Sequence, residues 1–219
     1  MRGMIAVLPV AFLVAGCASE IPSPLGADAI KSMRLTDVAV TVAPDAIISW
    51  GNAEHEYVTA HNASSPKPSK QPVVETGSIH DPVGADTAES NALAATPEGK
   101  AFVRAKAASR VKEALDTGLK PALQSGTRPV KLEVTVHAFT VPSAIQRVLV
   151  GGQPVLNASA VLKDATTGEV LVSRPNTMAM AMSGNGWAGV LVDQALSDLD
   201  ARLAESYAEQ YRKWLLHEA

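Results

Sequence analysis

The chain's single cysteine, Cys17, follows a stretch whose residue types suit proteolytic processing and acylation. Arg2 precedes an apolar run over residues 4–15, which has the length of the hydrophobic region of a signal peptide. The run is too short to cross a bilayer comfortably, since a spanning helix needs about 20 residues. Small side chains at Ala15 and Gly16 leave room for a signal peptidase, and the thiol can accept a diacylglycerol. The pattern predicts that residues 1–16 are a lipoprotein signal peptide.

The tetrapeptide Val14-Ala15-Gly16-Cys17 resembles a bacterial lipobox. The resemblance implies two or three acyl chains on Cys17, and two or more chains anchor a protein stably where one binds only marginally. Ala18, rather than Asp, follows the cysteine, which in Gram-negative lipoproteins implies the outer membrane, facing the periplasm. We therefore expect the membrane to be a partner through Cys17. The alternative is a plain signal peptide or an N-terminal anchor with an incidental cysteine.

Composition excludes several classes of protein. Among 219 residues, 47% are hydrophobic and 19% charged, which excludes disorder throughout. The net charge of −3 provides no basic footprint, so nucleic acid is not an expected partner. One cysteine permits neither an intramolecular disulfide nor a multi-cysteine metal site. No cofactor is predicted.

Three methionines, Met178, Met180 and Met182, alternate with alanines. On a strand their thioethers project to one face, and thioethers select Cu(I). The favoured interpretation is that they fill the gap between a sheet and a helix. A Cu(I) carrier is the alternative.

A glycine pattern over residues 184–189, Gly-Asn-Gly-Trp-Ala-Gly, matches the dinucleotide-binding fingerprint between a strand and a helix. A dinucleotide site needs a second parallel strand after that helix, and here the chain ends instead. We interpret the segment as a strand-to-helix turn. Anion binding at the helix start is the alternative.

Histidines and serines form no catalytic or metal-binding motif. His55, His61 and His80 fall in a Pro- and Ser-rich stretch, and their spacing is not that of a zinc-binding helix. His137 lies on a predicted strand without an evident partner, and no G-x-S-x-G motif is present. We expect no catalytic or metal-binding residues, and an enzyme would need a triad that only the fold assembles.

The elements that position these residues are read from periodicity. Alternation predicts strands over 34–42, 130–139, 145–150, 155–163, 169–174 and 177–182, with a hairpin turn at 164–168. Thr96 as a cap and Pro97 in the first turn predict a helix over 97–119, and a second helix is expected over about 187–216. The fold class is α+β, a mainly antiparallel sheet with two long helices packed on one face.

The domain organisation follows from these elements. Residues 17–33 are an acylated tether, and 34–219 form a single α+β domain. A mobile insertion is expected at about 51–97, because its composition is poor in large apolar residues.

The two predicted helices carry features beyond their apolar stripes. The first is basic, through Lys100, Arg104, Lys106, Arg110 and Lys112, and the second acidic, through Asp193, Asp198, Asp200, Glu205 and Glu209. The favoured interpretation of such runs is a solvated face. Helices that lie side by side with complementary charge are one alternative, and membrane contact by the basic face is another. Aromatic residues of the second helix favour core packing, with a docking surface as the alternative: Tyr207, Tyr211 and Trp214.

Arg34-Leu35-Thr36-Asp37-Val38, the Gly151-Gly152 pair and the hairpin over 164–171 resemble a family of uncharacterised alphaproteobacterial lipoproteins. The resemblance covers the predicted mature chain apart from the insertion, and it implies fold and location but no activity. The sequence therefore predicts a non-enzymatic binding or assembly accessory of the cell envelope with an envelope protein as partner. A ligand or Cu(I) carrier is the first alternative, and an enzyme with an unrecognised site the second.

Overall fold

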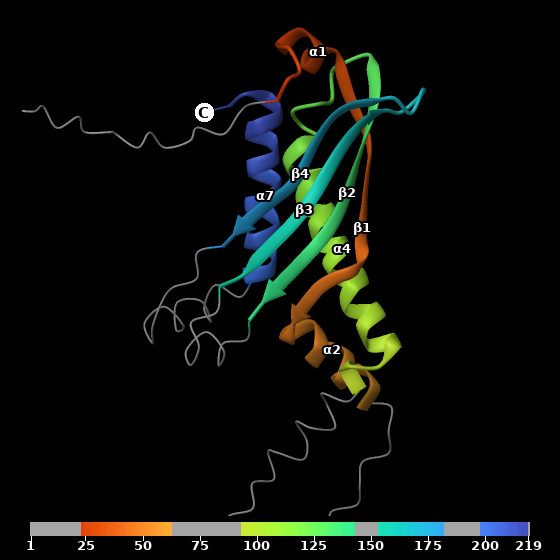
Figure 1. Cartoon of the computed structure of the whole chain (residues 1–219), viewed down its shortest axis with the longest axis vertical. Helices are drawn as coiled ribbons and strands as arrows, with labels where there is room; N and C mark the ends of the chain where they lie inside the picture. The colour runs from red at the N-terminus through yellow and green to blue at the C-terminus, as the bar shows by residue number, and fades with distance from the viewer. Residues whose placement is uncertain (1–22, 63–92, 143–152, 182–197, 219) are drawn as a thin grey trace, which may run out of the picture.

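The computed structural model describes residues 23–62, 93–142, 153–181 and 198–218 (Figure 1). In this part of the chain a four-stranded sheet carries helices on one side. The elements in chain order are α1 (Ala27–Ser32), β1 (Met33–Trp50), α2 (Gly51–Asn62), α4 (Pro97–Leu119), β2 (Arg128–Val141), β3 (Val155–Asp164), β4 (Val170–Met180) and α7 (Leu199–Leu216).

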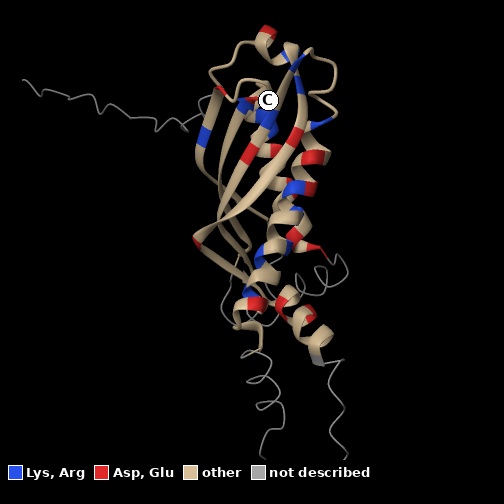
Figure 2. Ribbon diagram, turned by 90° about the vertical axis from the view of Figure 1, so that its right-hand side faces the viewer, with Lys and Arg blue, Asp and Glu red and all other residues tan. Residues whose placement is uncertain are grey.

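The strand order is β1-β2-β3-β4. β1 and β2 are parallel, because the chain returns through α2 and α4 before β2 begins. β2, β3 and β4 are antiparallel neighbours. Figure 2 shows the sheet as one layer and the long helices as the other. The predicted α+β class, with two long helices on one face, is confirmed.

The start of α4 follows the local chemistry predicted from sequence. The Thr96 hydroxyl accepts a hydrogen bond from the Gly99 N–H at 3.1 Å, and Pro97 occupies the first turn. Val103, Ala107 and Val111 then recur at intervals of four and are buried. The predicted bounds of 97–119 are confirmed.

The hairpin turn between β3 and β4 is also built as predicted. An oxygen of the Asp164 carboxylate accepts hydrogen bonds from the backbone N–H groups of Thr166 and Thr167, at 2.9 and 3.0 Å. The Gly168 N–H donates a hydrogen bond to the Asp164 carbonyl at 2.9 Å, which closes the turn. Gly168 has a φ of 78°, which a residue without a Cβ adopts at no steric cost.

Bulges in the strands were not predicted. The first strand was predicted over 34–42, but β1 continues to Trp50 because the register shift between Val42 and Ile47 accommodates Pro44. Strands predicted over 169–174 and 177–182 are one strand, β4. An extra residue at His137 in β2 turns Phe139, rather than Ala138, toward the core.

Several predicted boundaries differ from the structure. The end of the predicted tether forms α1 and carries the buried Ile30. The first twelve residues of the predicted insertion form α2, which packs against α4. Its remainder over 63–92, the predicted strand at 145–150 and the predicted helix start at 187 lie outside the described residues. The signal peptide over 1–16 stays a prediction.

Candidate functional site

The two faces of the sheet have different surroundings. On the helix-covered face, every second side chain of the central strands is buried beneath α4 and α7, as Leu132, Leu156 and Leu162 illustrate. On the opposite, open face, the described helices do not pack, and the alternate side chains, such as Glu133, Asn157 and Val161, are only partly buried. We therefore take the open face as the candidate functional surface.

The end of the open face nearest α1 is charged, and we call it the charged half. Glu133 on β2 lies between two lysines, with Lys131 Nζ at 2.9 Å and Lys163 Nζ at 2.5 Å from its carboxylate oxygens. Hydrogen bonds from Lys163 and Lys131 lower the pKa of Glu133. At the same end of the sheet, but on the side to which Leu132 and Leu162 point, Arg128 Nε donates to Asp164 Oδ2 at 2.8 Å.

On strands β2 to β4, the other end of the open face carries no such charges, whereas on β1 the exposed Asp45 lies two residues before Ile47. Residues 134–141 of β2, 155–162 of β3 and 175–180 of β4 contain no Asp, Glu, Lys or Arg. We call the open-face side chains of these three segments, together with Ile47 of β1, the uncharged half. The lower parts of β2 to β4 are correspondingly tan in Figure 2.

Large apolar side chains are exposed in the uncharged half. Met178 and Met180 are each 56% exposed, and Ile47 is 69% exposed. The two methionines share a face because they are two residues apart on β4. Ile47 lies on β1, at the opposite edge of the sheet from β4. An adjacent exposed pair such as Met178 and Met180 is a candidate contact surface for another molecule.

The position of Met178 and Met180 corrects a prediction. They were expected to fill the gap between sheet and helix, but Thr177 and Ala179 take those inward positions. The reason is that β4 has one extra residue opposite Ser159, where Asn176 adopts a φ of 47°. The extra residue reverses which face of the sheet the following side chains of β4 take. Met182 lies outside the described residues.

A histidine and a serine meet on the open face, which the sequence did not reveal. His137 Nε2 lies 2.8 Å from Ser159 Oγ, and the backbone N–H of Asn176 donates to the same oxygen at 3.2 Å. Register shifts flank Ser159 on both neighbouring strands, and they turn His137 and the Asn176 amide toward it.

This pair has part of the arrangement of a nucleophile and its general base. Nucleophilic catalysis also needs a third group that orients the base. Within the described residues, no carboxylate bonds to His137. The fold thus brings together two of the three groups that an enzyme of this kind would use.

The aromatic side chains of α7 pack in the core. Tyr207 and Tyr211 are fully buried, and burial raises the pKa of both phenols. Trp214 is partly buried against the same cluster, with the Arg174 guanidinium 5.0 Å from its ring. The core-packing prediction is confirmed for the two tyrosines, so they are not available as docking residues.

The basic side chains of α4 mostly serve the fold. Arg110 Nε donates to Asp200 Oδ2 of α7 at 2.8 Å, which supports the alternative of two helices side by side with complementary charge. Lys106 pairs with Glu56 of α2, and Arg104 donates to the carbonyl of Ala43. Membrane contact by this face stays untested, and Asp193 lies outside the described residues.

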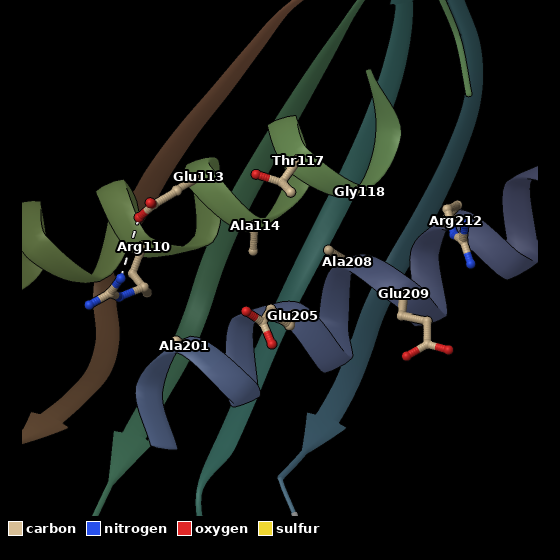
Figure 3. Close-up of a pocket in the computed structure, with 10 residues that line it drawn as sticks. All are labelled: Arg110, Glu113, Ala114, Thr117, Gly118, Ala201, Glu205, Ala208, Glu209 and Arg212. Carbon is tan, nitrogen blue, oxygen red and sulfur yellow. Dashed lines mark hydrogen bonds and ion pairs between the residues drawn. The ribbon is translucent and has the colours of Figure 1, made fainter. Parts of the chain in front are cut away.

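A groove runs between α4 and α7 on the outer side of the helix layer (Figure 3). It has a volume of about 380 Å³, small side chains at its floor and charged side chains of both signs at its rim. The residues that line it are Arg110, Glu113, Ala114, Thr117, Gly118, Ala201, Glu205, Ala208, Glu209 and Arg212. Its floor is narrow because the helices approach closely, with Ala208 Cβ at 3.6 Å from where a Cβ on Gly118 would lie.

The remaining predicted positions contribute no site among the described residues. His55 and His61 lie on α2, and His61 Nδ1 contacts the Tyr57 carbonyl at 2.8 Å. The described ranges hold no group of three or more His, Cys, Asp or Glu residues arranged to bind a metal ion. Cys17, His80 and the glycine pattern over 184–189 lie outside these ranges. None of the described helices is long and apolar enough to span a membrane.

No protein-family model matches the sequence, and no curated protein is similar to it. Among solved structures, a candidate lipoprotein from Caulobacter crescentus is similar, with 19% identity over 48% of this chain and 77% of that chain, and a TM-score of 0.31. A DUF330 protein from Xanthomonas campestris is 14% identical over 82% of this chain and 87% of that chain, with a TM-score of 0.28. The PelC dodecamer from Paraburkholderia phytofirmans is 13% identical over 86% of this chain and 94% of that chain, with a TM-score of 0.31. Similarity at this level says nothing about ligands or partners.

Proposed function

We propose that this protein is a lipid-anchored lipoprotein of the outer membrane that faces the periplasm and acts as a non-enzymatic binding or assembly accessory of the cell envelope. The apolar run and the lipobox-like residues before Cys17 support the anchor. The observation that carries the binding role is the exposure of Met178, Met180 and Ile47 on a face that no described helix covers.

The uncharged half is the proposed binding surface, and its occupant is an uncharged, apolar segment of an envelope protein. A charged segment would lose hydration against this surface without gaining an ion pair, because residues 134–141, 155–162 and 175–180 carry no charge. Complete burial of a methionine contributes about 1.5–3 kcal/mol, so covering the exposed half of Met178 or Met180 contributes about 1 kcal/mol.

The anchor strengthens this binding by confining the domain. Acyl chains on Cys17 restrict the protein to the membrane plane, which raises its effective concentration for a partner in the same envelope layer. A surface of modest intrinsic affinity then suffices for association.

The anchor is tested by the variant Cys17→Ser, followed by labelling of cells with a fatty acid. We expect labelling to disappear and the protein to leave the membrane fraction. Undiminished labelling of the variant would contradict acylation at this residue.

The binding surface is tested by placing a charge in it. We expect Met178→Glu to abolish affinity capture of the partner from cross-linked cells. Val170→Glu is the matched control, because Val170 lies on the same strand with 54% exposure, near the charged half. Equal loss in both variants, or equal capture by both, would contradict the assignment.

A second candidate function is Cu(I) binding, favoured by the exposure of the Met178 and Met180 thioethers to solvent. The test is a Cu(I) titration of the protein and of a Met178→Leu, Met180→Leu variant. Stoichiometric binding that the variant loses would support a carrier, and absence of binding by the unchanged protein would exclude it.

A further inference from the structure

The chain that leads away from Cys17 is fixed to the domain within a few residues. Ser23 is only 4% exposed. Its N–H donates to the Trp214 carbonyl at 3.2 Å, and its own carbonyl accepts from His217 Nε2 at 2.9 Å. Ser23 is therefore held at the last turn of α7.

Only residues 18–22 separate Cys17 from this fixed point. An extended chain covers at most about 3.6 Å per residue, so Ser23 lies within roughly 20 Å of Cys17. The end of the fold at Ser23 cannot move further than this from the lipid surface if Cys17 carries acyl chains.

The elements at that end form a defined surface. They are α1, the start of β1, the turn between β3 and β4 at Asp164–Gly168, and the end of α7 (Figure 1). Lys31 and Arg34 are exposed there, and neither forms an ion pair with the described residues. Asp28 is the exposed acid of α1.

The uncharged half lies toward the opposite end of the sheet. β2 runs for 14 residues from Arg128, beside Met33, to Val141, beside Trp50. Strands rise about 3.3 Å per residue, so the sheet is about 45 Å long. Met180 pairs with Val155 of β3, and Val155 pairs with Thr140, one residue before the end of β2.

We infer that the α1 end is the membrane-facing surface of this protein and that the uncharged half is presented to the aqueous compartment, away from the lipid. This orientation rests on the proposed anchor at Cys17. A tether shorter than the sheet excludes an inverted domain. In an upright domain the partner of the uncharged half is a polypeptide in the periplasm rather than the bilayer.

The test anchors the mature chain chemically and measures height above the membrane. Cys17 is the chain's only cysteine, so vesicles that contain a maleimide phospholipid couple to it whether or not cells acylate it. Energy transfer from tryptophan to a dansyl phospholipid in the same vesicles then reports proximity. One variant, Trp50→Phe with Trp187→Phe, retains Trp214 at the α1 end. The other, Trp187→Phe with Trp214→Phe, retains Trp50 at the far end.

We expect transfer from Trp214 to exceed transfer from Trp50 several-fold. Equal transfer from both, as for a domain lying flat, or greater transfer from Trp50 would overturn the orientation. The Cys17→Ser form of each variant is the control and should show no transfer from its single tryptophan. Fatty-acid labelling in cells remains a separate test of the anchor, so a failed anchor and a failed orientation are distinguishable.

A second measurement uses the unsubstituted chain, in case a tryptophan variant does not fold. Hydrogen exchange of the coupled protein, compared with the uncoupled one, should slow in residues 27–36 and 164–168 and remain unchanged in α2. Slowing in α2 without slowing at the α1 end would contradict the orientation.

Discussion

The two faces of one sheet have become different surfaces in this protein. The covered face buries Leu132 and Leu162 beneath the long helices, with at most 1% of either exposed. The open face, one residue away along each strand, leaves Met178 and Met180 more than half exposed. Burial of apolar surface drives folding, so the covered face supplies stability. The exposed methionines of the open face contribute little stability and are available to a partner.

A deletion on the covered face should have the largest effect on stability. Leu132→Ala removes a fully buried side chain of β2 and leaves a cavity under α4 and α7. We expect the free energy of unfolding to fall by about 2–5 kcal/mol, measured by urea denaturation. A loss below about 1 kcal/mol would show that this face is less tightly packed than its burial indicates.

Loss of the serine between the bulges should have an intermediate effect. Ser159→Ala removes the oxygen that contacts His137 and accepts from the Asn176 N–H. We expect a decrease of about 1 kcal/mol in the free energy of unfolding, because each net hydrogen bond contributes about 0.5–1.5 kcal/mol. Labelling of the unchanged protein by a fluorophosphonate, absent in the variant, would instead indicate a reactive nucleophile and revive the enzyme alternative.

Acid should weaken the turn between β3 and β4, where Asp164 lies. Hydrogen bonds from Arg128 and from the Thr167 and Thr166 amides lower the pKa of Asp164 from 3.8 to about 2. A carboxyl whose pKa is lowered on folding stabilises the protein above its unfolded pKa and loses that contribution as the pH falls through its folded pKa. We expect Tm to fall between about pH 4 and pH 2, and less steeply for Asp164→Asn. Parallel Tm curves for the two proteins would contradict this assignment.

Substitutions in the uncharged half should leave stability almost unchanged. Met178→Ser with Met180→Ser removes two side chains that are each 56% exposed. We expect the free energy of unfolding to change by less than about 0.5 kcal/mol per site in the isolated protein, as at other surface positions. A loss as large as that of Leu132→Ala would remove the distinction between the two faces.

Local periodicity predicted much of the fold. The alternation of β2 up to Val136 and the capped start of α4 at Thr96 follow from short-range sequence patterns, and the structure confirms both. The buried tyrosines of α7 follow from helical spacing in the same way.

The candidate site was less predictable, because it depends on bulges. One extra residue reverses every later side chain of a strand, and His137 has no sequence signal that marks such a shift. Pro175 and Asn176 mark a break between two predicted strands, but not which face the later residues take. The methionines were consequently assigned to the wrong face. The contact between His137 and Ser159 joins residues 22 apart in sequence, so only the pairing of β2 with β3 reveals it.

The most direct test of the central claim is photo-cross-linking in intact cells from single positions on β4. A photoreactive amino acid replaces Met178 in one strain and Val170 in another, since both side chains are similarly exposed, at 56% and 54%. We predict that Met178 yields one defined adduct with an envelope protein and that Val170 does not. The same adducts from both positions, or none from Met178, would contradict a docking surface in the uncharged half.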